Sequence, residues 1–383
     1  MPDERRKRVG IMLSMDTEHW HGVLQGLADG FRETPNIQVL KLSRPAKFEA
    51  TVLRRLKLDG LITRIASKED EKLLAHAGLP VVNVSGRFAA EKLTNVVNDD
   101  ERVGALAAAF FRRRGYASFG FCGVERHRSS RLRQHGFRKA LEAEGIVVAE
   151  AILPELPEGD APSLQAVKRL AAWVKPLSKP VAVFCFNDAI ARAVSEACVE
   201  VEMIIPDDVA VLGVDNDDIQ LGFSAVALSS IELNRRLIGF KAARRLLDMV
   251  VEPALAIETL RVPPLKIVAR GSTDKLAVND PVVAAALDYI ADRLGNAIYV
   301  DDVARETGVS RRSLEMRFRA ALKTSVYAEV QRQQLERAEI LLKENPKLTI
   351  AEVAYACGFQ DARHLSVVCR RKLGRTPGSL RRE

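Results

Sequence analysis

Short apolar runs alternate with longer stretches of helical periodicity through the first 250 or so residues of the chain. Runs such as Gly60–Thr63 and Val209–Val214 are almost wholly apolar, which is typical of strands buried on both faces of a parallel sheet. The predicted strands are Arg8–Ser14, Ile37–Leu42, Gly60–Thr63, Pro80–Ser85, Thr94–Asn98, Ser118–Gly123, Pro180–Phe186 and Val209–Val214. The predicted helices are Trp20–Glu33, Val52–Leu58, Lys68–Ala77, Arg102–Arg114, Arg131–Glu144, Ser163–Val174, Ala189–Val199 and Leu233–Val251. Because these units are too many for one ordinary sheet, the pattern predicts two doubly wound α/β lobes.

The last eighty residues have a different pattern, and it occurs twice, about fifty residues apart. Each copy predicts a short helix, then Gly308 or Gly358 in a tight turn, then a second helix capped by Ser310 or Asp361. This is the pattern of a helix-turn-helix motif. The predicted helix Ser325–Lys343 joins the copies and is about 28 Å long, close to the ~34 Å between successive major-groove faces of DNA. The alternative is a helical bundle with an accidental repeat.

The positive charge is concentrated in this repeated region. The chain holds 58 Lys and Arg against 50 Asp and Glu, and residues 310–383 hold 16 of the former and eight of the latter. The rest of the chain therefore has 42 of each and is neutral. A basic terminal region on a neutral body favours binding to double-stranded DNA, and the alternative is a solvated basic face.

The two motifs predict which side chains read DNA. Leu314 and Phe318 in the first copy, and Leu365 and Cys369 in the second, are expected to point into the core. The exposed positions then carry side chains that contact base edges or phosphates. These candidates are Arg311, Arg312, Glu315, Arg319, Arg363, His364 and Ser366.

Polar residues follow the predicted strands, where open α/β sheets bind their ligands. Asp16 and the aromatic Trp20 come after the first strand, and comparable carboxylates and amides follow the later ones. Hydroxyl groups need such donors and acceptors, and the C–H face of a sugar ring needs an apolar plane. The pattern therefore favours a sugar, although Asp and Asn at strand ends also serve as turn formers and helix caps.

The cysteines and the chain start carry little chemistry. The five Cys include no Cys-x-x-Cys pair, so neither a zinc site nor a redox pair is indicated. Neither a signal peptide nor an apolar run long enough to cross a membrane is present, so we expect a cytoplasmic protein without a membrane partner. A P-loop and a dinucleotide-binding glycine motif are absent too. We expect no catalytic activity, no metal and no cofactor.

The stretch "RQQLERAEILL" from Arg332, followed by "LTIAEVAYACGFQDARHLSVVCRRKLGRTPGSLRR", resembles the signature of AraC-type DNA-binding domains. The resemblance covers about residues 280–383. The sequence departs from the family at Cys369, where Phe is usual, and at Leu365, which replaces Phe in a common His-Phe pair. Both replacements keep the position apolar, so we expect the core to accept them.

The first part of the chain resembles LacI-type sensors with a periplasmic-binding-protein fold. The stretches "RLRQHGFRKALEAEG", "VFCFNDAIARAV" and "IPDDVAVLGVDN" carry this resemblance, which covers about residues 8–270. It implies that Arg133, Asn187 and Asp215 face a bound sugar. Together with Asp16 and Trp20, they are the candidate ligand-binding residues.

A LacI-type sensor placed before an AraC-type domain resembles the bacterial xylose-operon regulators. The resemblance implies an arm at residues 1–8, a sensor at 9–270, a linker at 271–280 and a DNA-binding domain at 281–383. It implies a sugar-controlled transcription factor that acts as a homodimer, activates a carbohydrate-utilisation operon and has RNA polymerase as a further candidate partner. Xylose or a related sugar is the expected effector. The alternative function is a carbohydrate-binding protein without a DNA role.

Overall fold

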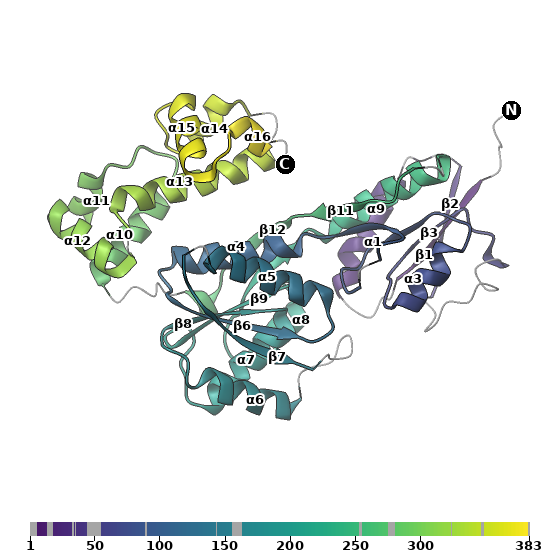
Figure 1. The fold of residues 1–383 in the computed structure, drawn as a ribbon, viewed down its shortest axis with the longest axis horizontal. Helices are drawn as coiled ribbons and strands as arrows, with labels where there is room; N and C mark the ends of the chain where they lie inside the picture. The colour runs from purple at the N-terminus through teal and green to yellow at the C-terminus, as the bar shows by residue number, and fades with distance from the viewer. Residues whose placement is uncertain are drawn as a thin grey trace. The chain divides into compact units, whose positions relative to one another are not determined.

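The computed structural model describes residues 6–13, 18–32, 34, 36–43, 55–88, 90–142, 144–154, 163–252, 255–274, 280–322, 324–345 and 348–381. The chain divides into two compact units, Met1–Lys275 and Leu276–Glu383. Figure 1 shows the α/β elements of the first unit and the helices of the second.

The first unit, which we call the sensor unit, contains two sheets in its described residues. One has the strand order β2-β1-β3-β4-β5-β11 and is parallel throughout, and the other has the order β7-β6-β8-β9-β10-β12 with only β12 antiparallel. Both are doubly wound sheets with a reversal of strand order next to the first strand. The strands are β1 Lys7–Met12, β2 Ile37–Lys41, β3 Gly60–Thr63, β4 Val81–Asn83, β5 Thr94–Asn98, β6 Ser118–Val124, β7 Val148–Leu153, β8 Val181–Cys185, β9 Val209–Val214, β10 Ser229–Leu233, β11 Thr259–Val262 and β12 Pro264–Val268.

Helices cover the sheets and bury separate apolar cores. Residues of β6, β8, α6 and α7 form the core of the second sheet, and residues of β1, α1 and α9 form that of the first. The helices α1 and α9 lie side by side (Figure 1). A Cβ at Gly26 would lie 1.9 Å from the carbonyl oxygen of Arg236, so only glycine permits this approach. The helices are α1 Glu18–Phe31, α3 Lys68–Ala75, α4 Asp100–Arg113, α5 Arg128–Glu142, α6 Leu164–Val174, α7 Asp188–Glu200, α8 Asp218–Gly222 and α9 Arg235–Val251.

The chain passes between the two sheets after β5, after β10 and after β11, as far as the described strands show. The sequence pattern predicted the central strands but missed β7, β10, β11 and β12. Of these strands, β7, β11 and β12 lie at sheet edges, where partial exposure and residues such as Pro264 break the continuous apolar run. Strand β10 begins with two buried serines, which break it as well. The predicted helix Leu233–Val251 began too early, because Leu233 ends β10 and Asn234 caps α9. Part of the predicted helix Val52–Leu58 lies outside the described residues.

The second unit, which we call the DNA-binding unit after its predicted role, is all-helical in its described residues. Its helices are α10 Pro281–Asp292, α11 Val300–Glu306, α12 Arg311–Leu322, α13 Val326–Glu344, α14 Ile350–Ala356, α15 Ala362–Leu373 and α16 Pro377–Arg381. One core gathers around α10, α11 and α12, and another gathers around α14, α15 and α16. Helix α13 supplies Val326 and Val330 to the first core and Leu335, Ala338 and Leu342 to the second.

Both predicted helix-turn-helix motifs are present. The turns between α11 and α12 and between α14 and α15 hold Gly308 at φ +67° and Gly358 at φ +77°. Ser310 Oγ accepts from Ser313 N at 3.2 Å, and Asp361 caps α15 by accepting from His364 N at 2.6 Å. The predicted fold class, a two-lobed α/β sensor followed by an all-α domain with two such motifs, is confirmed.

Candidate functional site

The residues of the second sheet that are expected to bind the effector lie close together, where the strand order of this sheet reverses. Because β6, β8 and β9 are parallel, their carboxyl ends meet at one edge of the sheet. His127 lies just beyond β6, Phe186 and Asn187 follow β8, and Asp215 follows β9. Separate segments of the sequence therefore supply one cluster, which we call the strand-end cluster.

Arg133 on α5 is almost fully buried beside this cluster. Its Nε donates to Asp100 Oδ1 at 2.8 Å, its Nη1 donates to the Phe186 carbonyl oxygen at 2.5 Å, and its guanidinium carbon lies 5.1 Å from the centre of the Phe186 ring. Asp100 and Arg133 are 2 % and 4 % exposed. A buried ion pair with further hydrogen bonds holds a side chain in one geometry, so Arg133 is preorganised.

Asp215 has a backbone conformation that few residues other than glycine adopt. Its φ is +111°, and the φ of Asn216 is +50°. The carboxylate is partly exposed and lies 3.0 Å from Nη2 of Arg235, the first residue of α9. Local strain of this kind is often found at functional sites, and here it directs a carboxylate toward an arginine from the segment that joins the two sheets.

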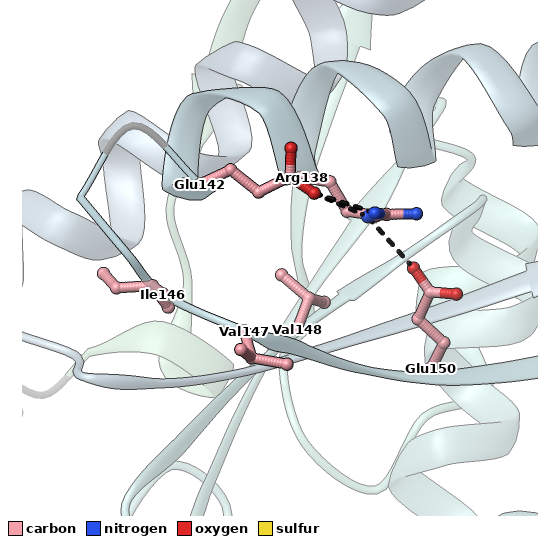
Figure 2. Close-up of a pocket in the computed structure, with 6 residues that line it drawn as sticks. All are labelled: Arg138, Glu142, Ile146, Val147, Val148 and Glu150. Carbon is pink, nitrogen blue, oxygen red and sulfur yellow. Dashed lines mark hydrogen bonds and ion pairs between the residues drawn. The ribbon is translucent and has the colours of Figure 1, made fainter.

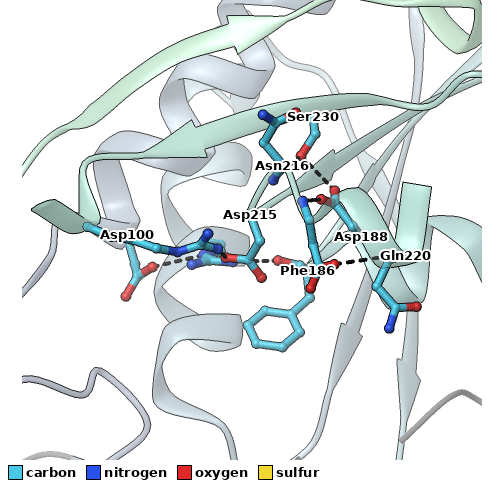
Figure 3. A network of polar contacts seen from close by, with 10 residues as sticks. Asp100, Phe186, Asp188, Asp215, Asn216, Gln220 and Ser230 are labelled. Atoms are coloured by element: carbon cyan, nitrogen blue, oxygen red, sulfur yellow. Dashed lines mark hydrogen bonds and ion pairs between the residues drawn. The ribbon is translucent and has the colours of Figure 1, made fainter. Parts of the chain in front are cut away.

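A buried carboxylate, Asp188, supports this strained loop, and it was not among the candidate ligand-binding residues. Asp188 accepts from Ser230 Oγ at 2.6 Å and from Asp217 N at 2.9 Å, while Asn216 N donates to Ser230 Oγ at 3.0 Å. Figure 3 shows Asp215 and Asn216 beside Asp188 and Ser230. Burial raises the pKa of Asp188 to about 8, and the nearby Asp215 contributes to this rise.

Asn187, Trp20 and Asp16 are the remaining candidate ligand-binding residues. Asn187 caps α7, and its Oδ1 accepts from Ile190 N at 3.0 Å, so this oxygen serves the capping role. Trp20 is 2 % exposed and packs in the core of the first sheet. Asp16 lies outside the described residues. Their contacts with an effector stay predictions.

His127 is an aromatic member of the cluster that was not predicted from the sequence. Its ring centre lies 4.7 Å from that of Phe186. Burial lowers the pKa of His127 to about 3, and the charges of Arg133 and Arg87 act in the same direction. The imidazole is therefore neutral at physiological pH, and its ring is tilted by 55° against that of Phe186.

A surface pocket lies elsewhere on the sensor unit, between the end of α5 and the edge strand β7. It is lined by Arg138, Glu142, Ile146, Val147, Val148 and Glu150. Figure 2 shows Arg138 between its two acidic partners, 2.8 Å from Glu142 and 3.7 Å from Glu150. The positive charge of Arg138 is balanced by these two carboxylates. The pocket contains none of the residues that are expected to bind the effector. In the described part of the chain, acidic, His and Cys side chains form no cluster suited to a metal ion.

The side chains of the first motif that are predicted to contact DNA differ in their exposure and in their contacts within the protein. Arg312 and Arg319 are exposed, and Arg311 is exposed with its Nη1 3.3 Å from Asp301. Glu315 is partly buried and accepts from Val326 N, the first residue of α13, at 3.4 Å. Leu314 and Phe318 are fully buried, as predicted.

In the second motif Arg363 is exposed on α15. The His364 ring packs edge-on against Phe359 at 5.5 Å between centres, and Ser366 Oγ donates to Ala362 O at 2.8 Å. Leu365 and Cys369 are fully buried, so the family departures at these positions keep an apolar core. The arginines of both motifs, Arg311, Arg312, Arg319 and Arg363, are therefore the most accessible of the candidates.

The two motifs are tied together beyond their shared helix α13. Gln334 Nε2 donates to Gly358 O at 3.1 Å, and Arg337 Nη1 donates to Leu294 O at 2.6 Å. A Cβ at Gly358 would lie 2.2 Å from the carbonyl oxygen of Asn296. The loop after α10 thus lies directly against the turn of the second motif, which holds the two motifs at one spacing.

Comparisons with known proteins match both units. The periplasmic binding protein-like domain family matches residues 108–273, and the helix-turn-helix domain family matches residues 303–383. A xylose operon regulatory protein of Escherichia coli is 26% identical over 98% of this chain and 97% of its own length. Its counterpart in Haemophilus influenzae is 23% identical over 99% of both chains. The solved structure of a xylose-binding transcription activator has a TM-score of 0.61 and 25% identity, covering 99% of this chain and 98% of that one.

The chain is a DNA-binding transcriptional regulator. The predicted resemblance to the xylose-operon regulators, with a LacI-type sensor placed before an AraC-type domain, is confirmed over the full length. These relatives are regulators and not enzymes. A ribose-bound LacI-family regulator from Enterococcus faecium, at 23% identity and a TM-score of 0.55, shares the fold of the sensor unit. Among the described helices, none has the length and apolarity to cross a membrane.

Proposed function

We propose that this chain is a cytoplasmic, dimeric activator of a carbohydrate-utilisation operon, controlled by xylose or a related sugar and without catalytic activity. The observation that carries the sugar assignment is the strand-end cluster. Arg133 of α5 and Asp215 at the end of β9 come from separate segments, and the Arg133 guanidinium lies 5.1 Å from the centre of the Phe186 ring. Donors and acceptors at fixed positions suit hydroxyl groups, and the aromatic plane suits the C–H face of a sugar. The full-length similarity to xylose operon regulatory proteins supports xylose as the first candidate.

Binding is expected to use charges that are already paired in the described structure. Arg133 is held by Asp100, and Asp215 by Arg235. A sugar hydroxyl that joins such a pair makes a charge-assisted hydrogen bond with a side chain that is already placed in the site. The neutral His127 beside Phe186 adds aromatic surface without adding charge.

DNA binding is assigned to α12 and α15, with Arg311, Arg312, Arg319 and Arg363 as the main contacts and Glu315, His364 and Ser366 as secondary ones. Residues 310–383 have an excess of eight positive charges. One pair of motifs covers about two turns of the major groove. Two protomers bound to adjacent half-sites therefore gain affinity through effective concentration, which supports the proposed homodimer. RNA polymerase is the expected partner of an activator.

The test begins with thermal unfolding of the full chain in the presence of D-xylose, D-ribose, L-arabinose, D-glucose and D-glucuronate. One of these should raise the unfolding midpoint, and glycerol at the same concentration is the control. DNA selected from a random pool by the full chain is then titrated with and without that sugar. A sugar should change the affinity for the selected DNA by roughly 5–150-fold, the usual range of allosteric coupling.

The alternative function, a carbohydrate-binding protein without a DNA role, predicts sugar stabilisation with no sequence preference in the selected DNA. An enzyme would consume its sugar, which a mass measurement after prolonged incubation detects. Failure of every sugar to stabilise the protein would contradict the proposed effector class and leave the DNA-binding assignment standing.

A further inference from the structure

The last residues of the sensor unit are bonded directly to the strained loop of the strand-end cluster. Arg270, which follows β12, donates from Nη2 to Asn216 Oδ1 at 2.8 Å and from Nη1 to Leu228 O at 3.0 Å. Asn216 is the immediate neighbour of Asp215. The Arg270 side chain thus links the neighbour of the candidate ligand-binding carboxylate to the end of the unit.

The residues after Arg270 are anchored inside the second sheet. Ser272 Oγ donates to Val211 O at 2.6 Å and accepts from Ser229 N at 2.8 Å. Thr273 Oγ1 lies 2.7 Å from Ser229 Oγ, and both Ser272 and Thr273 are fully buried. From this turn the chain leads to α10, which begins at Pro281 in the DNA-binding unit. The chain therefore leaves the sensor unit from a fixed point.

The loop of Asp215 and Asn216, at the other end of this connection, contacts arginines from two different segments. Asp215 pairs with Arg235 of α9, whereas Asn216 bonds Arg270. Both loop residues have positive φ values. Asn216 N donates to Ser230 Oγ, which donates to Asp188, and Asp215 N donates to Ile231 O at 3.0 Å. A strained conformation of this kind persists only while the surrounding contacts hold it, so the loss of a contact at Asp215 is expected to shift the loop. Asn216 is covalently next to Asp215, so the shift reaches the Arg270 bond.

We propose that the Asn216–Arg270 hydrogen bond is the link through which occupation of the effector site acts on the segment leading to the DNA-binding unit. This inference rests on the proposed function for the identity of the effector. A sugar that hydrogen-bonds Asp215 weakens its pairing with Arg235, moves the loop, and changes how firmly Arg270 and the Gly271–Thr273 turn are held. The link connects two sites through a conformational element that both can bias, which is the physical requirement for coupling.

The main variant is Asn216→Gly, which keeps the positive φ accessible and removes the acceptor of Arg270. Asn216→Asp retains an acceptor oxygen and is expected to behave like the unmodified chain. Asn36→Gly is the matched control, because Asn36 is also a left-handed asparagine, with φ +61°, but precedes β2 and makes no contact with this loop among those described. All variants are made in the full chain.

The first measurement is amide hydrogen exchange without sugar, followed in peptides that contain Arg270–Asp274. Asn216→Gly should speed exchange there about fivefold, the factor that corresponds to the usual net strength of one hydrogen bond. Asn36→Gly and Asn216→Asp should leave it within experimental error. Unchanged exchange in Asn216→Gly would overturn the proposal, because the bond would then not hold the turn.

The second measurement adds D-xylose. In the unmodified chain and in Asn216→Asp, xylose should change exchange in Arg270–Asp274. In Asn216→Gly it should still raise the unfolding midpoint but leave this exchange unaltered. A full response in Asn216→Gly, or none in a xylose-stabilised unmodified chain, would overturn the link. Absence of any stabilisation by xylose would contradict the proposed effector instead, and the sugar-free comparison would still decide whether the bond holds the turn.

Discussion

Replacing Gly358 by Ala should destabilise the DNA-binding unit far more than replacing Gly308, although the two glycines occupy the same place in the repeated motif. Both have left-handed φ values, +77° and +67°, so both replacements carry the same conformational cost of about 1–2 kcal/mol. The two positions differ in their surroundings. A Cβ at Gly308 would meet no atom within 4 Å, whereas one at Gly358 would lie 2.2 Å from Asn296 O and 2.9 Å from Gln334 Nε2.

Overpacking of this kind costs about 1–3 kcal/mol, and the contact at Gly358 is with backbone that has little freedom to move. We therefore expect about 1–2 kcal/mol for Gly308→Ala and about 2–5 kcal/mol for Gly358→Ala. The clash also separates the second motif from the loop after α10, so Gly358→Ala should lose more affinity for selected DNA than its effect on stability explains.

The assay is urea unfolding of the full chain, followed in parallel by far-ultraviolet circular dichroism and tryptophan fluorescence. The two tryptophans, Trp20 and Trp173, both lie in the sensor unit, so fluorescence reports that unit alone. Gly358→Ala should shift the helical transition of the DNA-binding unit and leave the fluorescence transition in place. Equal destabilisation by the two replacements would refute the reasoning, because it would mean that the contact with Asn296 does not constrain the motif.

Three further predictions concern the two sites. Arg312→Ala and Arg363→Ala should each cost about 1–3 kcal/mol on selected DNA; equal losses on selected and random DNA, measured by fluorescence anisotropy, would restrict them to phosphate contacts. Asp215→Ala should abolish stabilisation by the effector in thermal unfolding while DNA binding stays measurable, and normal stabilisation would remove Asp215 from the site. The pKa of Asp188 is raised to about 8 by burial, whereas the pKa of an Asp in the unfolded chain is about 4. The folded chain therefore holds an extra proton between these values, and the stability of the sensor unit should fall as the pH rises through this window. Asp188→Asn should flatten that fall in urea titrations, and an unchanged slope would contradict the assignment.

The candidate site was only partly predictable, and its missing members share one cause. Arg133 and Asp215 were expected, and they lie in the strand-end cluster. Arg235 and Arg270 were not, because each follows a strand, β10 or β12, that the apolar pattern did not predict. Residues at the end of an unpredicted strand cannot be placed at the edge of a sheet from sequence. Asp188 was assigned no role because its partners, Ser230 and Asp217, lie far from it along the chain.

The sequence by itself determined the central strands, the doubled helix-turn-helix and the caps at Ser310 and Asp361. These features depend on short-range periodicity and on side chains that bond backbone within the next few residues. Tertiary structure alone decided the strands at and next to the sheet edges, the strain at Asp215 and Asn216, and the hydrogen bond from Arg270 to Asn216. Those features arise from contacts between residues widely separated along the chain, such as 54 positions for that bond, and local patterns carry no record of such contacts.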